Sequence, residues 1–409
     1  MPTLSRSLLI IFILSFLFYC LDYFFRISQS IIINPLIHQY HTTALGIGAF
    51  ASAFYLGYAL FQLPGGFLLD NFPFKPLLAT SILLCSISYA AFLFAHHFWL
   101  GYVLRLIVGL TSTLSFMGIL FIARATLSSN AFSLVAGLAI SIGTLSAASV
   151  QIVGVWLMHH WSWQLALSLF ALMGIGIGLL FMILPAPTLS TKRIGASQVI
   201  TQSLQFFKKP ILVYNALIGS LFYLPTTLFA SLWGVPFLMQ THYFSKTEAT
   251  FSIFLLFLGW AVGAPIMSWI ANQLHHIYRL IRYCALIALC ISLLLLYCTI
   301  KQHWLVEFII FALGLASSAQ AVVWKLFDTY CPRNSNGIAI SWTNMLIMLS
   351  GMIFHLCVGY LLTLPFLKTT TGFNYTLGLA LIPLAFFIVA ISAGCLRSSH
   401  NDLAIVIGR

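Results

Sequence analysis

Long hydrophobic runs separated by short polar gaps repeat along the whole chain. The runs reach the ~20 apolar residues that a helix needs to cross a bilayer. Alternating segments typical of outer-membrane barrels are absent, so the spans are predicted to be helices. Twelve spans are predicted, near residues 7–36, 44–69, 77–96, 99–122, 130–157, 163–184, 211–239, 247–272, 279–299, 304–325, 335–363 and 373–396.

The first two runs carry polar features that refine this prediction. The first is too long for a signal peptide, contains Asp22 and Arg26, and has no small-x-small cleavage site. It is therefore interpreted as a retained span. The second run contains Pro64-Gly-Gly and ends at Asp70, followed by a short loop with Lys75, which predicts a hinge at the membrane surface.

Composition agrees with a polytopic membrane protein, since 61% of the 409 residues are hydrophobic and only 6% are charged. So few charges cannot cover the surface of a soluble domain of this size, whereas apolar helix faces need no cover in lipid. The eight cysteines include no Cys-x-x-Cys pair, so neither a disulfide framework nor a metal site is expected.

The positive charges lie in the gaps between runs and predict the orientation of the chain. The net charge of +12 forms no single basic patch, so no nucleic-acid partner is expected. With the N-terminus in the cytoplasm, the outside gaps contain only Lys246, Lys301 and Lys368. The inside gaps then contain Arg6, Lys75, Arg124, Lys192, Arg193, Lys208, Lys209, Arg279, Arg282, Arg333, Arg397 and Arg409. This positive-inside bias predicts that both termini are cytoplasmic.

The two halves of the chain resemble each other. The sequence 137–141, Gly-Leu-Ala-Ile-Ser, recurs as Gly-Ile-Ala-Ile-Ser at 337–341, and Pro64 is matched by Pro265. Two matches at nearly one offset indicate a duplicated six-helix unit, a known plan of transporters with the solute site between the halves. The predicted organisation is an N-terminal bundle at 1–184, a cytoplasmic linker at 185–210 and a C-terminal bundle at 211–409. A monomer is expected.

The loop after the second run resembles the signature of the major facilitator superfamily, Gly-x-Leu-x-Asp-Arg-x-Gly-Arg-Lys. The matching residues are Gly66, Leu68, Asp70 and Lys75, whereas Asn71, Pro73 and Phe74 depart from the signature. The fourth span carries Arg105-x-x-x-Gly109, similar to another motif of that family. The resemblance implies an all-α fold of two six-helix bundles. It also implies a gate in which Asp70 accepts hydrogen bonds from the amides that begin the eleventh span; the alternative is a solvated helix end.

Three stretches carry a narrower resemblance: residues 22–28 (Asp-Tyr-Phe-Phe-Arg-Ile-Ser), 58–64 (Tyr-Ala-Leu-Phe-Gln-Leu-Pro) and 232–240 (Leu-Trp-Gly-Val-Pro-Phe-Leu-Met-Gln). Together they resemble the phagosomal nutrient transporters of intracellular gammaproteobacteria. The last stretch is the most specific, because the others are shared with anion–proton symporters. The resemblance implies proton-driven uptake of amino acids, nucleosides or similar solutes.

Ionisable residues within spans are the candidates for solute binding and proton coupling, because such groups are costly in lipid. Asp22 and Arg26 share one face of the first helix, and Arg105 lies at a similar depth in the fourth. We expect the three to meet in a cavity with a net positive charge. An arginine then binds a carboxylate or phosphate, and Asp22 couples protons. The alternative is a buried ion pair that fastens the two helices. Glu307 in the tenth span is a further coupling candidate or an interfacial charge.

Other residues are candidates for the cavity wall, each with packing or lipid contact as the alternative. They are Tyr55, Gln62, Tyr223, Trp233 and Asn344, joined by Gln320 and Trp324. Pro225 and Pro236 interrupt the seventh span, which is therefore predicted to be the outer gate. His355 in the eleventh span is a candidate pH sensor or an ordinary buried histidine.

The predicted function is secondary transport. The sequence has no Gly-x-x-x-x-Gly-Lys-[Ser/Thr] loop, no His-Glu-x-x-His helix and no Gly-x-Ser-x-Gly elbow. An enzyme is therefore not expected, nor a cofactor. We predict a proton symporter of the bacterial inner membrane that moves an amino acid, nucleoside or organic anion. The alternatives are an exporter of drugs or a siderophore, a membrane transferase, and a transporter-like sensor without flux.

Overall fold

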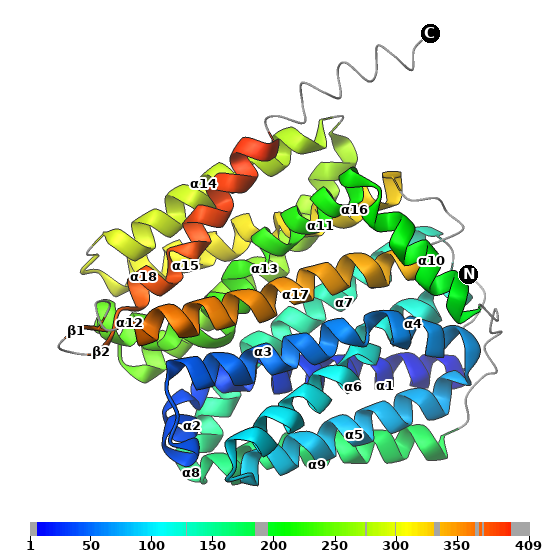
Figure 1. The fold of residues 1–409 in the computed structure, drawn as a ribbon, viewed down its shortest axis with the longest axis horizontal. Helices are drawn as coiled ribbons and strands as arrows, with labels where there is room; N and C mark the ends of the chain where they lie inside the picture. Colours follow the sequence, from blue (N-terminus) through cyan, green and yellow to red (C-terminus); the bar gives the residue numbers. More distant parts are fainter. Residues whose placement is uncertain are drawn as a thin grey trace.

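The computed structural model describes residues 6–127, 129–184, 195–274, 276–298, 300–330, 336–364, 368–369 and 372–393. Within these residues, eleven helices are long and apolar enough to cross a membrane, or twelve if one bent pair counts as a span. Figure 1 shows them as two bundles, with the first half of the chain below the second. The predicted all-α architecture of two six-helix bundles is therefore confirmed.

The helices follow one another with short connections. The first half contains α1 (Arg6–Ile27), η1 (Ser28–Ile31), α2 (Ile33–Tyr40), α3 (Ala44–Leu60), α4 (Gln62–Asn71), α5 (Phe74–Phe94), α6 (Phe98–Thr126), α7 (Ser129–Ser149), η2 (Val150–Gly154), α8 (Val155–His160) and α9 (Trp163–Ile183). The second half contains α11 (Pro210–Phe222), η3 (Pro225–Trp233), α12 (Gly234–Thr241), α13 (Lys246–Gln273), α14 (Ile277–Tyr297), α15 (His303–Ser317), η4 (Ser318–Ala321), α16 (Val322–Tyr330), α17 (Asn336–Thr363) and α18 (Tyr375–Leu379). Between the halves lies α10 (Ala196–Phe207).

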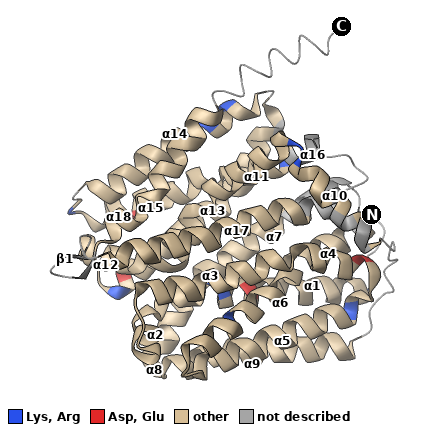
Figure 2. Cartoon of the chain, in the orientation of Figure 1, with Lys and Arg blue, Asp and Glu red and all other residues tan. Residues whose placement is uncertain are grey.

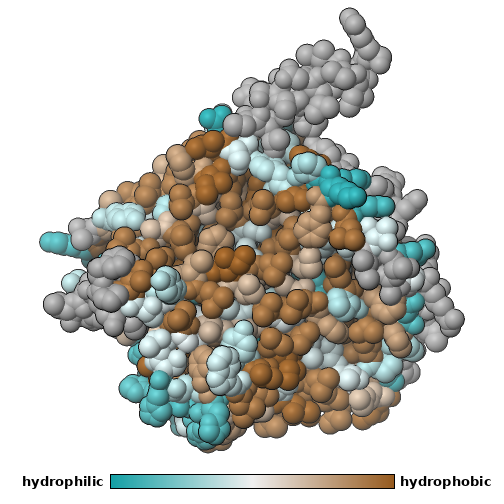
Figure 3. Space-filling model, viewed as in Figure 1, coloured by the Kyte–Doolittle hydropathy of each residue, from teal (hydrophilic) through white to brown (hydrophobic). Residues whose placement is uncertain are grey.

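The two ends of the molecule differ in what covers them. A two-stranded antiparallel hairpin, β1 (Lys368–Thr369) and β2 (Gly372–Phe373), pairs Lys368 with Phe373. It lies beside α12 at what we name the hairpin end, on the left of Figure 1, where α2 and α8 lie further down. The opposite end carries α10 and is named the linker end. Figures 2 and 3 show charged and hydrophilic residues mostly near these ends, with an apolar surface between them. This distribution is what a bilayer around the middle of the molecule requires.

The first predicted span, 7–36, is too long. The membrane-crossing helix ends at Ile31, and α2 is a separate short helix bent by 108° from α3. Pro35 explains the break, because its ring nitrogen has no hydrogen to donate to the carbonyl of Ile31 four residues earlier. The second span is likewise interrupted between α3 and α4, where Pro64 cannot bond to Leu60.

The seventh span is built from three pieces, as its prolines suggested. Helix α11 is followed by η3, nine residues of wide π-helix, and then by α12. Pro225 begins η3, and Pro236 lies inside the first turns of α12. Segments of π-helix are often found at functional sites. Here η3 packs against η1 of the first span, so the two bundles touch on the hairpin side of the molecule.

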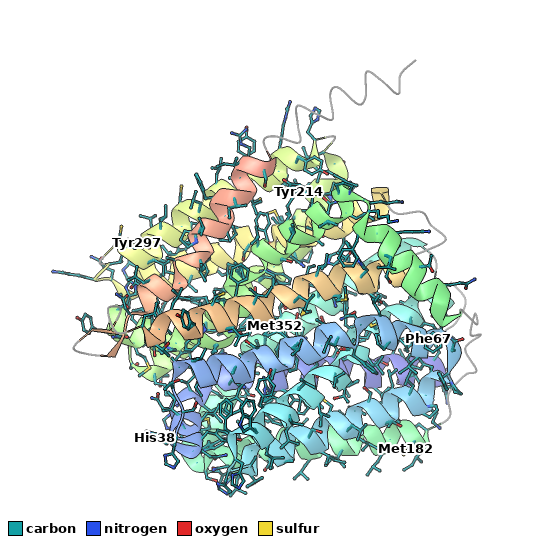
Figure 4. All side chains as sticks on the ribbon, viewed as in Figure 1. His38, Phe67, Met182, Tyr214, Tyr297 and Met352 are labelled. Carbon is teal, nitrogen blue, oxygen red and sulfur yellow. The ribbon has the colours of Figure 1, made fainter. Side chains whose placement is uncertain are left out.

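Four helices form the most extensive contacts between the bundles. Helix α3 lies alongside α17, and α7 lies alongside α13 (Figure 1). The Ser52 hydroxyl donates to the carbonyl of Met352 at 2.9 Å, and Met352 lies where α17 faces α3 (Figure 4). In the second pair, the Ser141 hydroxyl donates to the carbonyl of Ala261 at 3.3 Å.

Glycines permit the closest helix crossings, in the same way in each half. A methyl group added at Gly57 would overlap the carbonyl oxygen of Leu106, and one added at Gly109 would overlap that of Phe54. Helices α3 and α6 therefore touch backbone to backbone. In the second half, Gly259 lies in the same manner against the carbonyl of Phe311, where α13 crosses α15. Small residues at such crossings are a general feature of membrane bundles.

The linker between the halves contains a helix that the sequence analysis did not predict. Phe206 of α10 packs with Leu212 and Trp342 into a small buried cluster of its own. Phe67 of α4, labelled in Figure 4, covers this cluster from the first bundle. Helix α10 thus contacts both bundles at the linker end. The boundaries 1–184, 185–210 and 211–409 stay a prediction.

His242, in the turn after α12 and outside the spans, makes the stability depend on pH. Its Nε2 donates to the carbonyl of Leu295 at 3.0 Å, and burial lowers the pKa of the imidazole although this hydrogen bond opposes the shift. Below the ordinary value of about 6.5 the unfolded chain binds more protons, so stability falls with pH until the lowered pKa is reached. We expect the melting temperature to fall between about pH 7.5 and pH 5.5, and to fall less in His242→Gln. An equal fall in both proteins would contradict this role.

Candidate functional site

A small cavity, partly open to solvent, lies between the bundles; the empty space inside it and at its mouth together is about 400 Å³. Each bundle contributes six lining residues. Those of the first half are Tyr19, Tyr23, Arg26, Tyr58, Phe116 and Ile140. Those of the second half are Tyr223, Trp260, Gln320, Trp324, Asn344 and Met348. The cavity is therefore a shared site of the two halves, as the predicted transporter plan requires.

Asp22 and Arg26 form a buried ion pair at the wall of this cavity. Nη2 of Arg26 donates to Oδ2 of Asp22 at 2.9 Å, and both side chains are almost fully buried. The hydroxyl of Ser115 on α6 donates to the same oxygen at 3.1 Å. The other oxygen, Oδ1, has no hydrogen-bond partner among the described residues. The pair follows from the spacing of four on α1, which places both side chains on one face.

Arg26 also connects the two bundles. Its Nη1 donates to the hydroxyl of Tyr223 on the seventh span at 3.3 Å. The hydroxyls of Tyr23 and Tyr223 lie 3.4 Å apart, and these two residues are separated by the 200 positions of the internal repeat. The guanidinium carbon lies 4.7 Å from the ring centre of Tyr23 and 5.0 Å from that of Tyr58. These aromatic faces partly replace water around the cation.

Arg105 lies outside the cavity lining. Its Nη1 donates to the backbone carbonyl of Phe25 at 2.8 Å, and its guanidinium is stacked over Phe54 and Phe92 at 5.2 and 5.5 Å. This contact fastens α6 to the end of α1, just before η1. The structure therefore brings Asp22 and Arg26 together and does not bring Arg105 to them. The site that results has a paired charge rather than the net positive charge expected from the sequence.

Of the predicted wall residues, Tyr223 and Asn344 line the cavity, as do Gln320 and Trp324. The others lie elsewhere. Tyr55 is stacked on His355 with ring centres 5.3 Å apart, and Trp233 of η3 is buried 6.3 Å from Tyr375. Gln62 is buried at the break between α3 and α4, where its amide atoms have no partner among the described residues. Glu307 lies half-buried in the second turn of α15, outside the cavity lining.

The gate motif lies at the linker end. A methyl group added at Gly66 would come within 3.3 Å of the Ser341 hydroxyl, so α4 and α17 approach closely here. Asp70 is half-buried near the end of α4, and Lys75 is half-buried at the start of α5. The side chains of residues 336–340 lie outside the described part of the chain. The latch between Asp70 and the start of the eleventh span stays a prediction.

Most of the aromatic residues in the cavity wall were not predicted from the sequence. Tyr19, Tyr58, Phe116 and Trp260 line the cavity without having been singled out. Tyr19 and Tyr23 precede Arg26 by seven and three residues, so helical spacing from Arg26 was a usable signal for both. No comparable signal exists for Trp260, because no charged residue marks its face of α13.

The family follows from a match that covers most of the chain. The family model described as Major Facilitator Superfamily matches residues 11–355. The chain belongs to this superfamily. It is therefore a multi-pass membrane transporter of the secondary type and not an enzyme. Members of the superfamily bind small-molecule solutes in the membrane. No curated protein matches the sequence.

Solved structures of the major facilitator superfamily share the fold at low sequence identity. The nucleoside transporter NupG is 13% identical with a TM-score of 0.71, covering 95% of this chain and 99% of that one. A bacterial homologue of the human lysosomal transporter Spinster, inward-facing and unoccupied, is 14% identical with a TM-score of 0.68, covering 95% and 96%. The xylose transporter XylE from E. coli, partially occluded and inward open, is 11% identical with a TM-score of 0.70, covering 95% and 97%. At these identities the likeness shows the fold alone.

Proposed function

We propose that this superfamily member imports a small polar solute across the bacterial inner membrane by proton symport. The observation that carries the proposal is the buried Asp22–Arg26 pair, which lies at the cavity wall and reaches Tyr223 of the other bundle. The solute would be an amino acid, a nucleoside or an organic anion.

The proton acts through the ion pair. While Asp22 is ionised it holds Nη2 of Arg26 and leaves Nη1 for Tyr223, which fastens the first span to the seventh. A proton on Asp22 removes the charge that compensates Arg26 in a site with little water. The guanidinium must then find another partner, such as a polar group of the solute. Proton and solute are thereby coupled to the contact between the bundles.

The bundle contacts support alternating access. On the hairpin side of the cavity, η1 packs against η3, and Gly48 of α3 lies against the backbone of α17 at His355. With both termini in the cytoplasm, as the positive-inside bias predicts, this closed side faces outward. Separation of η1 from η3 would then open the cavity to the outside. The transporter would work as a monomer, with the solute, protons and lipid as its partners.

One further observation supports uptake. Residues 22–28, 58–64 and 232–240 resemble the phagosomal nutrient transporters, which suggests a nutrient as the solute. Export of drugs or a siderophore is the competing direction.

Vesicles of known orientation test the proposal. We expect right-side-out vesicles energised by a proton gradient to accumulate a radiolabelled solute, and an uncoupler to abolish this accumulation. Inside-out vesicles with an acidic lumen that accumulate the solute would show proton-driven export instead. Accumulation that persists with the uncoupler would contradict proton coupling.

A further inference from the structure

We propose that the cavity selects an uncharged solute with a planar ring and an amide-like polar edge, the chemistry of a nucleobase or nucleoside. This inference rests on the proposed transport function and narrows its solute class. Three properties of the lining carry it: its charge, its rings and its unpaired carboxamides.

The first property is the balance of charge. Among the described residues, Arg26 is the only Lys, Arg, Asp or Glu that lines the cavity, and the buried Asp22 neutralises it at 2.9 Å. An anionic solute would have to compete with this carboxylate for the guanidinium. A cationic solute meets no acid, because the side chain of Asp22 is fully buried behind the lining. While Asp22 is ionised, either ion would lose water without full compensation, which favours a solute without net charge in that state.

The second property is an aromatic wall in each bundle. In the first half, Tyr19 is stacked on Phe116 with ring centres 5.3 Å apart. In the second half, Tyr223 lies 5.9 Å from Trp260, and Trp324 joins them in the lining. Flat π-faces from both bundles suit a planar ring between them. Stacking of a nucleic-acid base on an aromatic side chain contributes roughly 1–3 kcal/mol in other proteins.

The third property is a pair of free carboxamides. Gln320 of η4 and Asn344 of α17 both line the cavity and are 5% and 6% exposed. Neither amide hydrogen-bonds to another group in the part of the chain that the structure describes. A carboxamide presents a donor beside an acceptor, which matches the amide-like edge of a base. Both amides face the cavity, so a solute that replaces their water with hydrogen bonds is favoured over an apolar one, which would leave them unpaired.

Other solute classes fit these properties less well. A free sugar can lay a C–H face on one of these rings, but it has no π-surface to stack between rings of both bundles. A zwitterionic amino acid needs separate partners for its carboxylate and ammonium group, and no acidic residue lines the cavity in the part of the chain that the structure describes. A nucleotide would bring phosphate charge to a site that is already neutral.

Binding to the purified full-length protein tests the solute class. Tritiated uridine and adenosine serve as probes, with uridine monophosphate, D-xylose and phenylalanine as competitors in excess. We expect an unlabelled nucleoside to displace the probe and the three competitors to fail. In Trp260→Leu and Asn344→Leu the dissociation constant should rise at least about tenfold, the scale of one lost stacked ring or paired amide.

The matched control is Trp304→Leu, because Trp304 is 67% exposed at the outer end of α15. It should bind nucleoside like the wild type, and melting curves should show that all variants are folded. Stronger binding of the sugar, the amino acid or the nucleotide would overturn the solute class and leave proton symport standing. Binding of none of the probes would also overturn the class. Nucleoside transport that continues at the same rate with an uncoupler would contradict proton symport, but the assignment of a nucleoside as the solute would still hold.

Discussion

Asp22→Asn is expected to abolish proton-driven accumulation while leaving solute exchange across the membrane measurable. The amide keeps the size of the side chain and can still accept from Ser115 and Arg26, but it cannot take up a proton. Coupling is lost, whereas the movement of the bundles around the cavity is not. The measurement compares uptake driven by a pH gradient with counterflow of labelled solute in proteoliposomes of the variant.

Ser115→Ala is the control for this experiment. It removes one hydrogen bond to the same carboxylate oxygen and leaves the proton-accepting group in place. We expect accumulation to persist in this variant, with a loss of stability of about 1–3 kcal/mol because a buried charge loses a donor. If Asp22→Asn accumulates solute as well as the wild type, Asp22 has no coupling role and the ion pair is a structural fastener.

Gly109→Ala is expected to disrupt folding of the first bundle. The added methyl group would overlap the carbonyl oxygen of Phe54, and backbone cannot yield as a flexible side chain can. Overpacking of this kind typically costs about 1–3 kcal/mol, and more where only backbone surrounds the site. We expect a sharp fall in the yield of monodisperse protein and in the melting temperature. Gly314→Ala should do the same in the second bundle, where the carbonyl of Leu256 occupies the corresponding space.

Gly176→Ala provides the comparison, because an added methyl group there meets nothing within 4 Å. Alanine favours the helix over glycine by up to about 1 kcal/mol, so this variant should be as stable as the wild type or slightly more so. Equal stability of Gly109→Ala and Gly176→Ala would show that α3 and α6 do not cross in backbone contact.

Much of the fold was predictable because the physical signals are local. Each span is a continuous apolar run, and the helix breaks coincide with Pro35, Pro64 and Pro225, which lack the hydrogen a helix needs. The pairing of Asp22 with Arg26 also follows from local geometry, since four residues make about one helical turn. The end of the first span was misplaced because the apolar run continues past the break at Ile32 into α2.

The parts that escaped prediction depend on how helices are rotated against one another. Arg105 was expected to face Asp22, but the orientation of α6 directs its guanidinium to the carbonyl of Phe25. Helix α10 was not predicted because its apolar residues do not form a long hydrophobic run. Phe206 instead packs against Trp342, a contact that exists only in the folded chain. Counting residues along a span gives the depth of a residue in the membrane. It does not give the direction in which the side chain points.

The sequence by itself determined that this chain is a helical membrane protein, where its spans lie, and that an acid and a base share one helix face. Only the tertiary structure decided which aromatic residues form the cavity and that Tyr23 meets Tyr223 across it. The reason is the solvent. In water, polarity separates buried from exposed faces, but lipid is as apolar as the protein interior. The apolar runs that contain Tyr19 and Trp260 therefore cannot be distinguished by sequence from lipid-facing runs. Only the packing of the helices places these two side chains in the cavity wall.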